Sequence, residues 1–376
     1  MTTNVAERGP VAELDPVAAT EVIEHLYDRG WTDGLPAVPA TDEAVARFLE
    51  QTPRDADEVI ARHAQLGRQA TVRDVAVHAV MAGCRPEYFP LVVAAWDALS
   101  ADRAARGGGW QSTSGPSPLV IVNGPIRHEM AINATGGVLG PGFRPNATIP
   151  RAIGLTVRNS FGIVPHELEQ ATQGLPGRWQ LGIAEDEESS PWEPFSVEGG
   201  VAAGEDAVSV MLLRTSEFVD NRHFTEPEQI LRDFADTIQR SGSWLFRTAS
   251  VGILMNPDHA RVFAEAGMSK QDVREWLVRH SGKTEAQLAA VGKSLNRHAD
   301  GPFAADHFHP VFADATPQSL PIIVAGSRNA AMSMVLRVFG TWSGRAIPVE
   351  RVDAGSSGSS GSSGSGSGSG SGEGAA

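Results

Sequence analysis

Glycines, amides and arginines gather in one stretch of the chain, residues 119–146, which reads LVIVNGPIRHEMAINATGGVLGPGFRPN. Glycine leaves backbone N–H groups unshielded, and Gly-rich loops after the carboxyl ends of strands bind anions and polar small molecules. Arginine offers a fork of donors to a carboxylate or phosphate, and amide side chains can donate or accept. The stretch therefore predicts a ligand-binding loop, with candidate binding residues Asn123, Arg127, Asn133, Gly136, Gly137, Arg144 and Asn146. The alternative is that the glycines form tight turns while the amides and arginines cap helices and tie loops together.

A second candidate loop lies at residues 324–329, VAGSRN. The pattern predicts a buried strand over 320–327 and a helix over 328–340, so that Ser327 and Arg328 would form an anion site at a helix N-terminus. The alternative is an ordinary turn capped by Ser327. Neither a G-x-G-x-x-G fingerprint nor a Walker lysine occurs, so no nucleotide or other organic cofactor is expected.

Asp33 and Glu193 are the candidate acid–base residues. Asp33 follows Trp31 in the dense turn GWTDGLP, where it acts as an acid or base or else as an Asx cap of its own turn. Glu193 follows Trp192 between two prolines, an arrangement that suits a pocket wall and general acid–base catalysis. The preceding acidic run, residues 185–188, is most simply a solvated loop.

Cys84 is the third candidate catalytic residue, because Arg85 directly after it would lower the thiol pKa. The alternative is a small buried hydrophobic residue at the end of a helix. Pro86 breaks the helical pattern here, which frees Glu87 and Tyr88 to point into a pocket. Arg85 and Glu87 are candidate substrate-binding residues.

Asp306, His307 and His309 are the only histidine cluster, and a His-x-His pair on a strand can bind zinc or iron. With no third strong ligand nearby, no metal is predicted, and metal-dependent hydrolysis remains an alternative function.

Composition excludes several classes of protein. The chain has 376 residues, a formal net charge of −14 and one cysteine, so nucleic acid would be repelled and no internal disulfide can form. No run of about 18 apolar residues and no secretory leader is visible, which predicts a cytoplasmic protein without a membrane span. A homodimer is the default expectation for its oligomeric state.

Helical and strand patterns alternate along the chain. Thr71, with Asp74 three residues on, predicts a capping box at the start of a helix, and residues 117–124 predict a short buried strand. A helix is expected to start near Ile149, and residues 226–242 predict an amphipathic helix.

The succession of strand, glycine turn and helix recurs at least twice. This predicts an α/β fold with a mixed or mostly parallel sheet and flanking helices. The expected division is a helical part over 1–118, an α/β part over 119–350 packed with it into one compact unit, and a flexible Gly/Ser tail over 355–376.

Several blocks of the sequence together resemble the bacterial UGSC-like family, named for a selenocysteine or cysteine motif, U/C-G-S-C. The resemblance covers nearly the whole folded chain, in the blocks GWTDGLPAVPATDEAV (30–45), AVMAGCRPEYFPLVVAAWDAL (79–99), 119–153, GIAEDEESSPWEPFSVE (182–198), HARVFAEAGMSKQDVREWL (259–277) and IIVAGS (322–327). The chain departs from the family's name because Cys84 stands alone and no Cys-Gly-Ser-Cys occurs. The family's thiol-redox character is therefore not carried over.

These patterns lead to one main expectation about function. The chain is expected to be an enzyme of small-molecule metabolism, of the lyase, cyclase or transferase type, that binds a small polar or anionic substrate in its Gly/Asn/Arg loops. A non-catalytic, substrate-binding partner of a thiol or selenol redox module is the alternative from another class.

Overall fold

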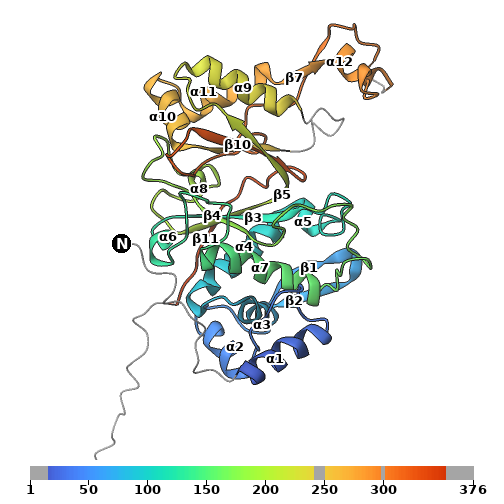
Figure 1. The fold of residues 1–376 in the computed structure, drawn as a ribbon, viewed down its shortest axis with the longest axis vertical. Coiled ribbons are helices and arrows are strands. Elements are labelled where there is room, and N and C mark those ends of the chain that lie inside the picture. The colour runs from blue at the N-terminus through green and yellow to red at the C-terminus, as the bar shows by residue number, and fades with distance from the viewer. Residues whose placement is uncertain (1–15, 241–249, 298–300, 353–376) are drawn as a thin grey trace, which may run out of the picture.

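A computed structural model describes residues 16–240, 250–297 and 301–352 of the chain (Figure 1). It confirms an α/β fold: a mixed sheet carries helices at both of its ends. The predicted Gly/Ser tail over 355–376 lies outside the described residues.

The first half of the chain is mainly helical and forms the lower part of Figure 1. Its elements are α1 (Pro16–Asp28), α2 (Asp42–Leu49), β1 (Val59–His63), η2 (Ala64–Leu66), β2 (Arg68–Thr71), α3 (Val72–Ala82), η3 (Pro86–Tyr88), α4 (Phe89–Ala101) and α5 (Arg103–Arg106). The predicted capping box of α3 is confirmed: the Thr71 hydroxyl accepts from the Asp74 N–H, and the Asp74 carboxylate accepts from the Thr71 N–H. The antiparallel β1–β2 pair was not predicted.

The elements that follow build one edge of the main sheet. They are β3 (Ser117–Asn123), α6 (Ile126–Glu129), α7 (Arg144–Asn159), β4 (Leu181–Ala184), α8 (Phe195–Glu198) and β5 (Ala207–Asp220). The sequence predicted α7 to begin near Ile149, but it begins at Arg144, with Pro145 in its first turn and Pro150 inside it. Arg144 and Asn146 therefore lie in the first turn of a helix rather than in the Gly-rich loop.

The upper part of Figure 1 contains the remaining elements. They are α9 (Pro227–Gln239), β6 (Val251–Met255), α10 (Pro257–Glu265), α11 (Lys270–His280), β7 (Gly282–Thr284), α12 (Glu285–Ala290), η5 (Leu295–Arg297), β8 (Phe308–Pro310), β9 (Ile322–Val324), β10 (Met332–Val338) and β11 (Ile347–Pro348). The described chain past 310 contains strands and loops, so the helix predicted over 328–340 is wrong.

The residue pattern and strand pairing of β10 explain why residues 328–340 do not form a helix. The segment Met332–Val338 alternates, because Met334 and Leu336 face one side of the sheet while Val335 packs into the core on the other. β10 pairs with β5 on one side and β6 on the other, both antiparallel, and this two-sided pairing decides its conformation.

The long strand β5 joins the two halves of the molecule. The sheet order is β4-β3-β5-β10-β6-β9, with β11 on β5. The first half of β5, 207–213, pairs with β3, and the second half, 213–220, pairs with β10. Its ribbon accordingly runs obliquely between the halves in Figure 1.

Three apolar clusters cover the sheet. On one face, α4 and α7 pack over β3, β4 and the start of β5, and α3 packs against these two helices. On the same face, α9 packs over the end of β5 and β10, and α10 and α11 belong to the same apolar cluster as α9, β6 and β9. The opposite face is continuous across both halves and is covered largely by loops and α8, through Val138, Leu175, Phe195 and Trp342. Because both faces are covered, every residue of β3 is buried, as its continuous apolar run predicted.

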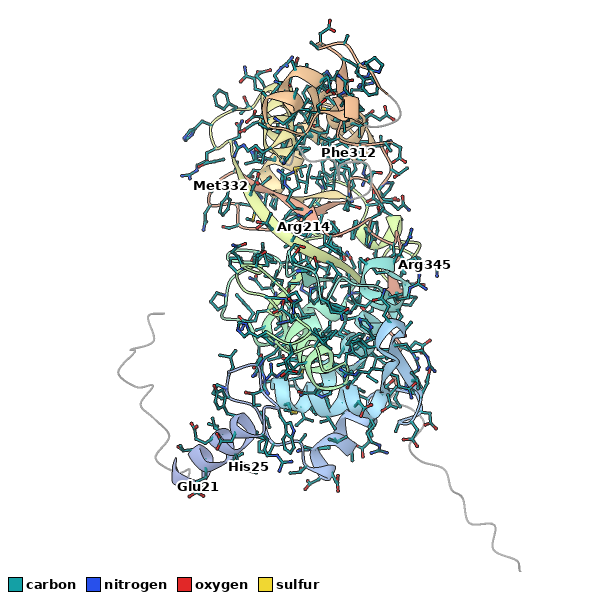
Figure 2. All side chains as sticks on the ribbon, turned by 90° about the vertical axis from the view of Figure 1, so that its right-hand side faces the viewer. Glu21, His25, Arg214, Phe312, Met332 and Arg345 are labelled. Atoms are coloured by element: carbon teal, nitrogen blue, oxygen red, sulfur yellow. The ribbon has the colours of Figure 1, made fainter. Side chains whose placement is uncertain are left out.

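The first apolar cluster extends from Leu26 to Leu212, so its packing runs through the expected boundary at 118. In Figure 2, Glu21 and His25 of α1 lie at one end of the molecule, whereas Phe312 and Met332 lie in the other half. No helix in the described ranges is both long and apolar enough to cross a membrane.

Candidate functional site

The Gly-rich stretch leaves the sheet where two parallel neighbours, β3 and β4, end side by side. Gly124 makes the turn with φ +87, and a Cβ at this position would lie 2.5 Å from the carbonyl oxygen of Glu205. Only glycine fits this close approach of two backbones. The turn directs the chain into the short helix α6 and then across the loop-covered face of the sheet, where Val138 packs.

Asn123, the last residue of β3, binds carboxylates. Its Nδ2 donates to Glu185 Oε2 at 2.7 Å and to Glu187 Oε1 at 2.9 Å. Glu185 is fully buried and also accepts the N–H groups of Phe195 at 2.6 Å and Val324 at 3.3 Å. This carboxylate thus connects β3, α8 and β9.

The expectation of a solvated acidic loop is therefore wrong for its first half, since Glu185 and Asp186 are buried. Burial raises the pKa of the Glu185 carboxyl, although the charge of Lys270 and the hydrogen bonds it accepts oppose the shift. Glu185 directly follows β4, as Asn123 ends β3, and this shared position at the strand ends was the signal for their contact.

Arg127 is buried beneath the same acidic loop. Its Nε donates to the Gly124 carbonyl at 2.8 Å, Nη1 to the Glu185 carbonyl at 2.7 Å, and Nη1 and Nη2 to the two oxygens of Glu188 at 3.1 and 3.0 Å. Each nitrogen of the guanidinium already donates within the protein. Its contacts are those of the alternative in which arginines tie loops together.

Glu188 gives this network a pH dependence. Its hydrogen bonds from Arg127 lower the pKa of the carboxyl to about 2, with His128 assisting. Because the folded pKa lies below the unfolded value, this carboxylate stabilises the fold above pH about 4.3 and the contribution disappears as pH falls towards 2. We expect Glu188→Gln to lower the melting temperature at pH 7, and the difference from wild type to vanish near pH 2. Thermal unfolding of both proteins from pH 7 to 2 measures this, and a difference independent of pH would contradict it.

Asn133 and Asn146 hold the far end of the loop. Asn146 Oδ1 accepts the Asn133 N–H at 2.9 Å, and Asn146 Nδ2 donates to the carbonyls of Asn133 at 3.1 Å and Gly182 at 2.8 Å. Asn133 Oδ1 accepts from the Thr135 N–H at 3.0 Å and its Nδ2 donates to the Gly136 carbonyl at 3.0 Å. The two amides thereby attach the loop to β4 and α7.

We expect Asn146→Ala to destabilise the fold by about 2 kcal/mol, because it leaves buried backbone groups of the loop and of β4 without partners. Asn159→Ala is a matched control on the same helix, since Asn159 makes a single bond to the Trp31 carbonyl at 2.9 Å. Urea unfolding of both variants measures the two costs. Equal losses would show that the buried amide does not anchor the loop.

The Gly-rich loop also meets the loop after β9. A Cβ added at Gly136 would lie 3.6 Å from the Ser327 side chain, and the Gly326 N–H donates to the Ala134 carbonyl at 2.8 Å. The Gly137 carbonyl accepts from Gly140 in a tight turn at 2.7 Å. Ser327 accepts from the Asn329 N–H at 3.0 Å, which is the predicted alternative of an ordinary capped turn.

Arg328 does not lie at a helix N-terminus, because β10 replaces the predicted helix. Its Nε donates to Asp258 Oδ1 at 3.1 Å, and its side chain is largely exposed.

A surface cavity of about 530 Å³ opens between η3, α6 and the start of α7. It brings together three residues predicted from sequence to bind substrate, Arg85, Glu87 and Arg144. The rest of its wall is formed by Tyr88, Glu129, Met130, Ala131, Gly142, Phe143 and Pro145. Its volume lies within the range of about 300–1,000 Å³ typical of small-molecule sites.

The charges in the cavity differ in their partners. Arg144 Nε donates to the Gly83 carbonyl at 2.8 Å, and Glu129 pairs with Arg351 at 2.6 Å. Arg85 and Glu87 are exposed, and neither forms an ion pair with any residue in the ranges 16–240, 250–297 and 301–352. A free guanidinium and a free carboxylate therefore line one cavity.

Cys84 is buried beside this cavity but does not line it. Burial raises the pKa of the Cys84 thiol to about 12, although a hydrogen bond to Thr148 and the charges of Arg144 and Arg151 oppose the shift. At neutral pH the group is thus a thiol rather than the nucleophilic thiolate.

Asp33 is paired with Arg151. The Arg151 Nε and Nη2 donate to the two carboxylate oxygens at 2.9 and 2.8 Å, and Asp33 Oδ1 also accepts from the Leu35 N–H at 3.3 Å, the predicted Asx turn. Burial opposes ionisation, but the hydrogen bonds and charge of Arg151 outweigh it and lower the pKa of Asp33. Neighbouring Trp31 lines a separate, mainly apolar cavity of about 290 Å³.

Trp192 and Glu193 lie on another part of the molecule. Trp192 Nε1 donates to the Met268 carbonyl at 3.2 Å, and the backbone carbonyl of Glu193 accepts from Lys270 Nζ at 3.0 Å. The Glu193 side chain is exposed.

The histidine cluster is used within the fold. His309 is buried, and its Nε2 lies 2.9 Å from Glu285 Oε2, while its ring lies 4.7 Å from that of His307. Among the residues that the structure describes, no group of three or more His, Cys, Asp or Glu side chains could hold a metal ion.

Comparison with known proteins does not name the site. No family model, curated protein or solved structure matches this chain. The function is therefore inferred from the geometry of the candidate site.

Sequence reasoning missed Glu129, Met130 and Phe143 in the cavity wall. They flank the Gly-rich loop, and only the approach of α6 to the start of α7 brings them opposite η3. An aromatic residue, Phe143, directly before Arg144 in the Gly-rich stretch was the signal that the sequence offered.

Proposed function

We propose that this protein is an enzyme that binds a small carboxylate-bearing molecule in the 530 Å³ cavity and moves a proton there. The observation that carries the proposal is a pair of charges, Arg85 and Glu87, that have no ion-pair partner among the described residues and line a cavity of suitable size. Arg85 would orient the carboxylate through its fork of donors. Glu87, two residues along the chain, would accept or donate the proton.

The surrounding residues support this arrangement. Arg144 donates to the Gly83 carbonyl, and this hydrogen bond fixes the position of its charge at the cavity. Met130, Phe143 and Pro145 supply an apolar wall that lowers the local dielectric and strengthens the interaction with Arg85. Proton abstraction next to a carboxylate, followed by elimination or addition, is the reaction class that these groups can perform.

Arg85→Ala tests the proposed anchor. With straight-chain carboxylates and their primary amides as probes, we expect wild type to bind carboxylates, and Arg85→Ala to weaken that binding by about 10- to 100-fold, as loss of a charge-assisted hydrogen bond implies. Calorimetric titration measures the affinities. Arg279→Ala, an exposed arginine on α11, is the control that should bind as wild type does. Equal binding of acids and amides by wild type would contradict the proposal.

Turnover is tested separately from binding. Any carboxylate that binds is incubated with wild type and Glu87→Gln in D₂O, and incorporation of deuterium into recovered ligand is followed by mass spectrometry. We expect exchange with wild type and its loss in Glu87→Gln, with affinity for the straight-chain carboxylates, which have no ammonium group, retained.

A second function, non-catalytic substrate binding for a partner thiol or selenol redox protein, is favoured by one observation. Two of the three predicted catalytic groups are engaged within the fold: Cys84 is a buried thiol, and Asp33 is paired with Arg151. Tight carboxylate binding without exchange or conversion would favour this function over the enzyme.

A further inference from the structure

We infer that the cavity recognises a zwitterion with an apolar body, of the α-amino-acid type, and this inference rests on the proposed function of the same site. The inference adds a second charged group, an ammonium, to the carboxylate already proposed. Glu87 is the residue that would bind this ammonium group.

The balance of charges in the cavity wall is the first argument. Arg85 and Arg144 line the cavity together with the carboxylates of Glu87 and Glu129, and Glu129 is paired with Arg351 at 2.6 Å. A purely anionic ligand would gain from the two arginines and lose to the Glu87 carboxylate. A zwitterion presents an opposite charge to each kind of group and has no net charge of its own.

The second argument is that the two free charges stand close together in sequence but are not paired with each other. Arg85 precedes Pro86, which begins the 3₁₀ turn that carries Glu87, and no ion pair within 4 Å joins the two side chains. An exposed ion pair gains only about 0–1 kcal/mol, because water screens both charges and pairing costs side-chain entropy. Here each remains available to a ligand that would bridge them.

The third argument concerns the rest of the wall. Met130, Phe143 and Pro145 are apolar, and the Phe143 ring is 41 % exposed in a position where it lines the cavity. An aromatic face attracts ammonium groups and also packs against apolar side chains. Glu129 is already paired with Arg351 at 2.6 Å, which leaves Glu87 as the lining carboxylate without an ion-pair partner in the described part of the chain.

Three matched probes test the inference by calorimetric titration at pH 7. They are L-phenylalanine, which carries both charges, N-acetyl-L-phenylalanine, which keeps only the carboxylate, and L-phenylalanine amide, which keeps only the ammonium. We expect wild type to bind L-phenylalanine at least about tenfold tighter than either derivative, as loss of one charge-assisted contact implies.

Two variants assign the charges. Glu87→Gln should abolish the preference for L-phenylalanine over the acetylated probe, while the acetylated probe binds at least as tightly as it does to wild type. Arg85→Ala should abolish the preference over the amide. Glu275→Gln, an exposed carboxylate on α11, is the control that should keep both preferences.

The titrations distinguish failure of the zwitterion inference from failure of the proposed carboxylate site. If the acetylated probe binds as tightly as L-phenylalanine and depends on Arg85 but not on Glu87, the zwitterion inference is wrong and the proposed carboxylate site stands. If the amide binds best, the zwitterion inference and the proposed carboxylate site are both wrong, because each requires Arg85 to bind a carboxylate. If folded wild type binds none of the three probes or the simple carboxylates, the cavity is not the site and both proposals fail together.

Discussion

Replacing Glu185 by alanine is expected to destabilise the protein by about 3 kcal/mol or more. The reason is that buried hydrogen-bond donors on three separate elements lose their acceptor. The Phe195 and Val324 N–H groups lose their side-chain acceptor, and the Asn123 amide loses one of its two. Equilibrium urea unfolding at pH 7 measures the cost. The exposed Glu205→Ala is the control and should change stability little.

Glu185→Gln provides a second readout through pH. Burial raises the pKa of Glu185 in the fold, so the protonated carboxyl is favoured by folding, and its contribution is fully present below the unfolded pKa of about 4.3. That contribution decreases as pH rises through the folded pKa, whereas a glutamine does not titrate. The advantage of wild type over Glu185→Gln should therefore shrink as pH rises from 4 to 8. An advantage that grows with pH would show that the carboxylate, not the acid, is the favoured form.

Glu198→Ala is the second large effect, expected at about 3–5 kcal/mol, because it leaves the buried Arg274 guanidinium without its counter-charge. Arg274 Nη2 lies 2.6 Å from both Glu198 oxygens and its Nε donates to the Leu320 carbonyl at 2.9 Å. The Arg274 side chain is 2 % exposed. Lys270 Nζ lies 3.9 Å from Glu198, so the variant also leaves two cations near one another.

An exposed pair of the same chemistry supplies the control for Glu198. Arg232 and Glu228 pair at 2.6 Å on the surface of α9, with both side chains more than 60 % exposed. Glu228→Ala should cost about 0.5 kcal/mol or less, since such surface pairs contribute little. The double variant Glu198→Leu with Arg274→Met should recover most of the loss. Equal costs for Glu198→Ala and Glu228→Ala would remove the argument that burial decides the strength of this pair.

The polar residues of the Gly-rich stretch and the charged residues of the cavity have different expected roles. The amides of the stretch and Arg127 hold the carboxyl ends of β3 and β4 to the neighbouring loops, so changes there should reduce stability. The side chains of Arg85 and Glu87 form no ion pair within the described residues, so changes there should alter ligand binding and leave the fold intact.

Local patterns predicted most elements well. The capping box at Thr71, the buried run of β3 and the amphipathic helix α9 each depend on neighbours within a few residues, which the sequence displays directly. Arg85 and Glu87 were also predictable, because Pro86 ends the helical pattern between them. β10 was not, since its strand conformation depends on pairing with β5 and β6, which lie 80 or more residues away in the chain.

The partners of the polar residues lay beyond sequence reasoning for the same reason. Asn123 meets Glu185 across 62 positions, and Arg351 meets Glu129 across 222. A sequence shows that an arginine or an amide is present, but not whether that side chain already donates to a carboxylate or a carbonyl of the same protein.

By itself, the amino-acid sequence of this protein determined the kinds and order of most elements and the residues able to bind a charged ligand, because these depend on local spacing and side-chain chemistry. Only the tertiary structure decided the strand conformation of β10 and which of the candidate binding residues have no partner. It buried Arg127, Asn146 and Cys84 in the fold and left Arg85 and Glu87 in one cavity without an ion-pair partner among the described residues, since burial and pairing depend on contacts between segments distant in the chain.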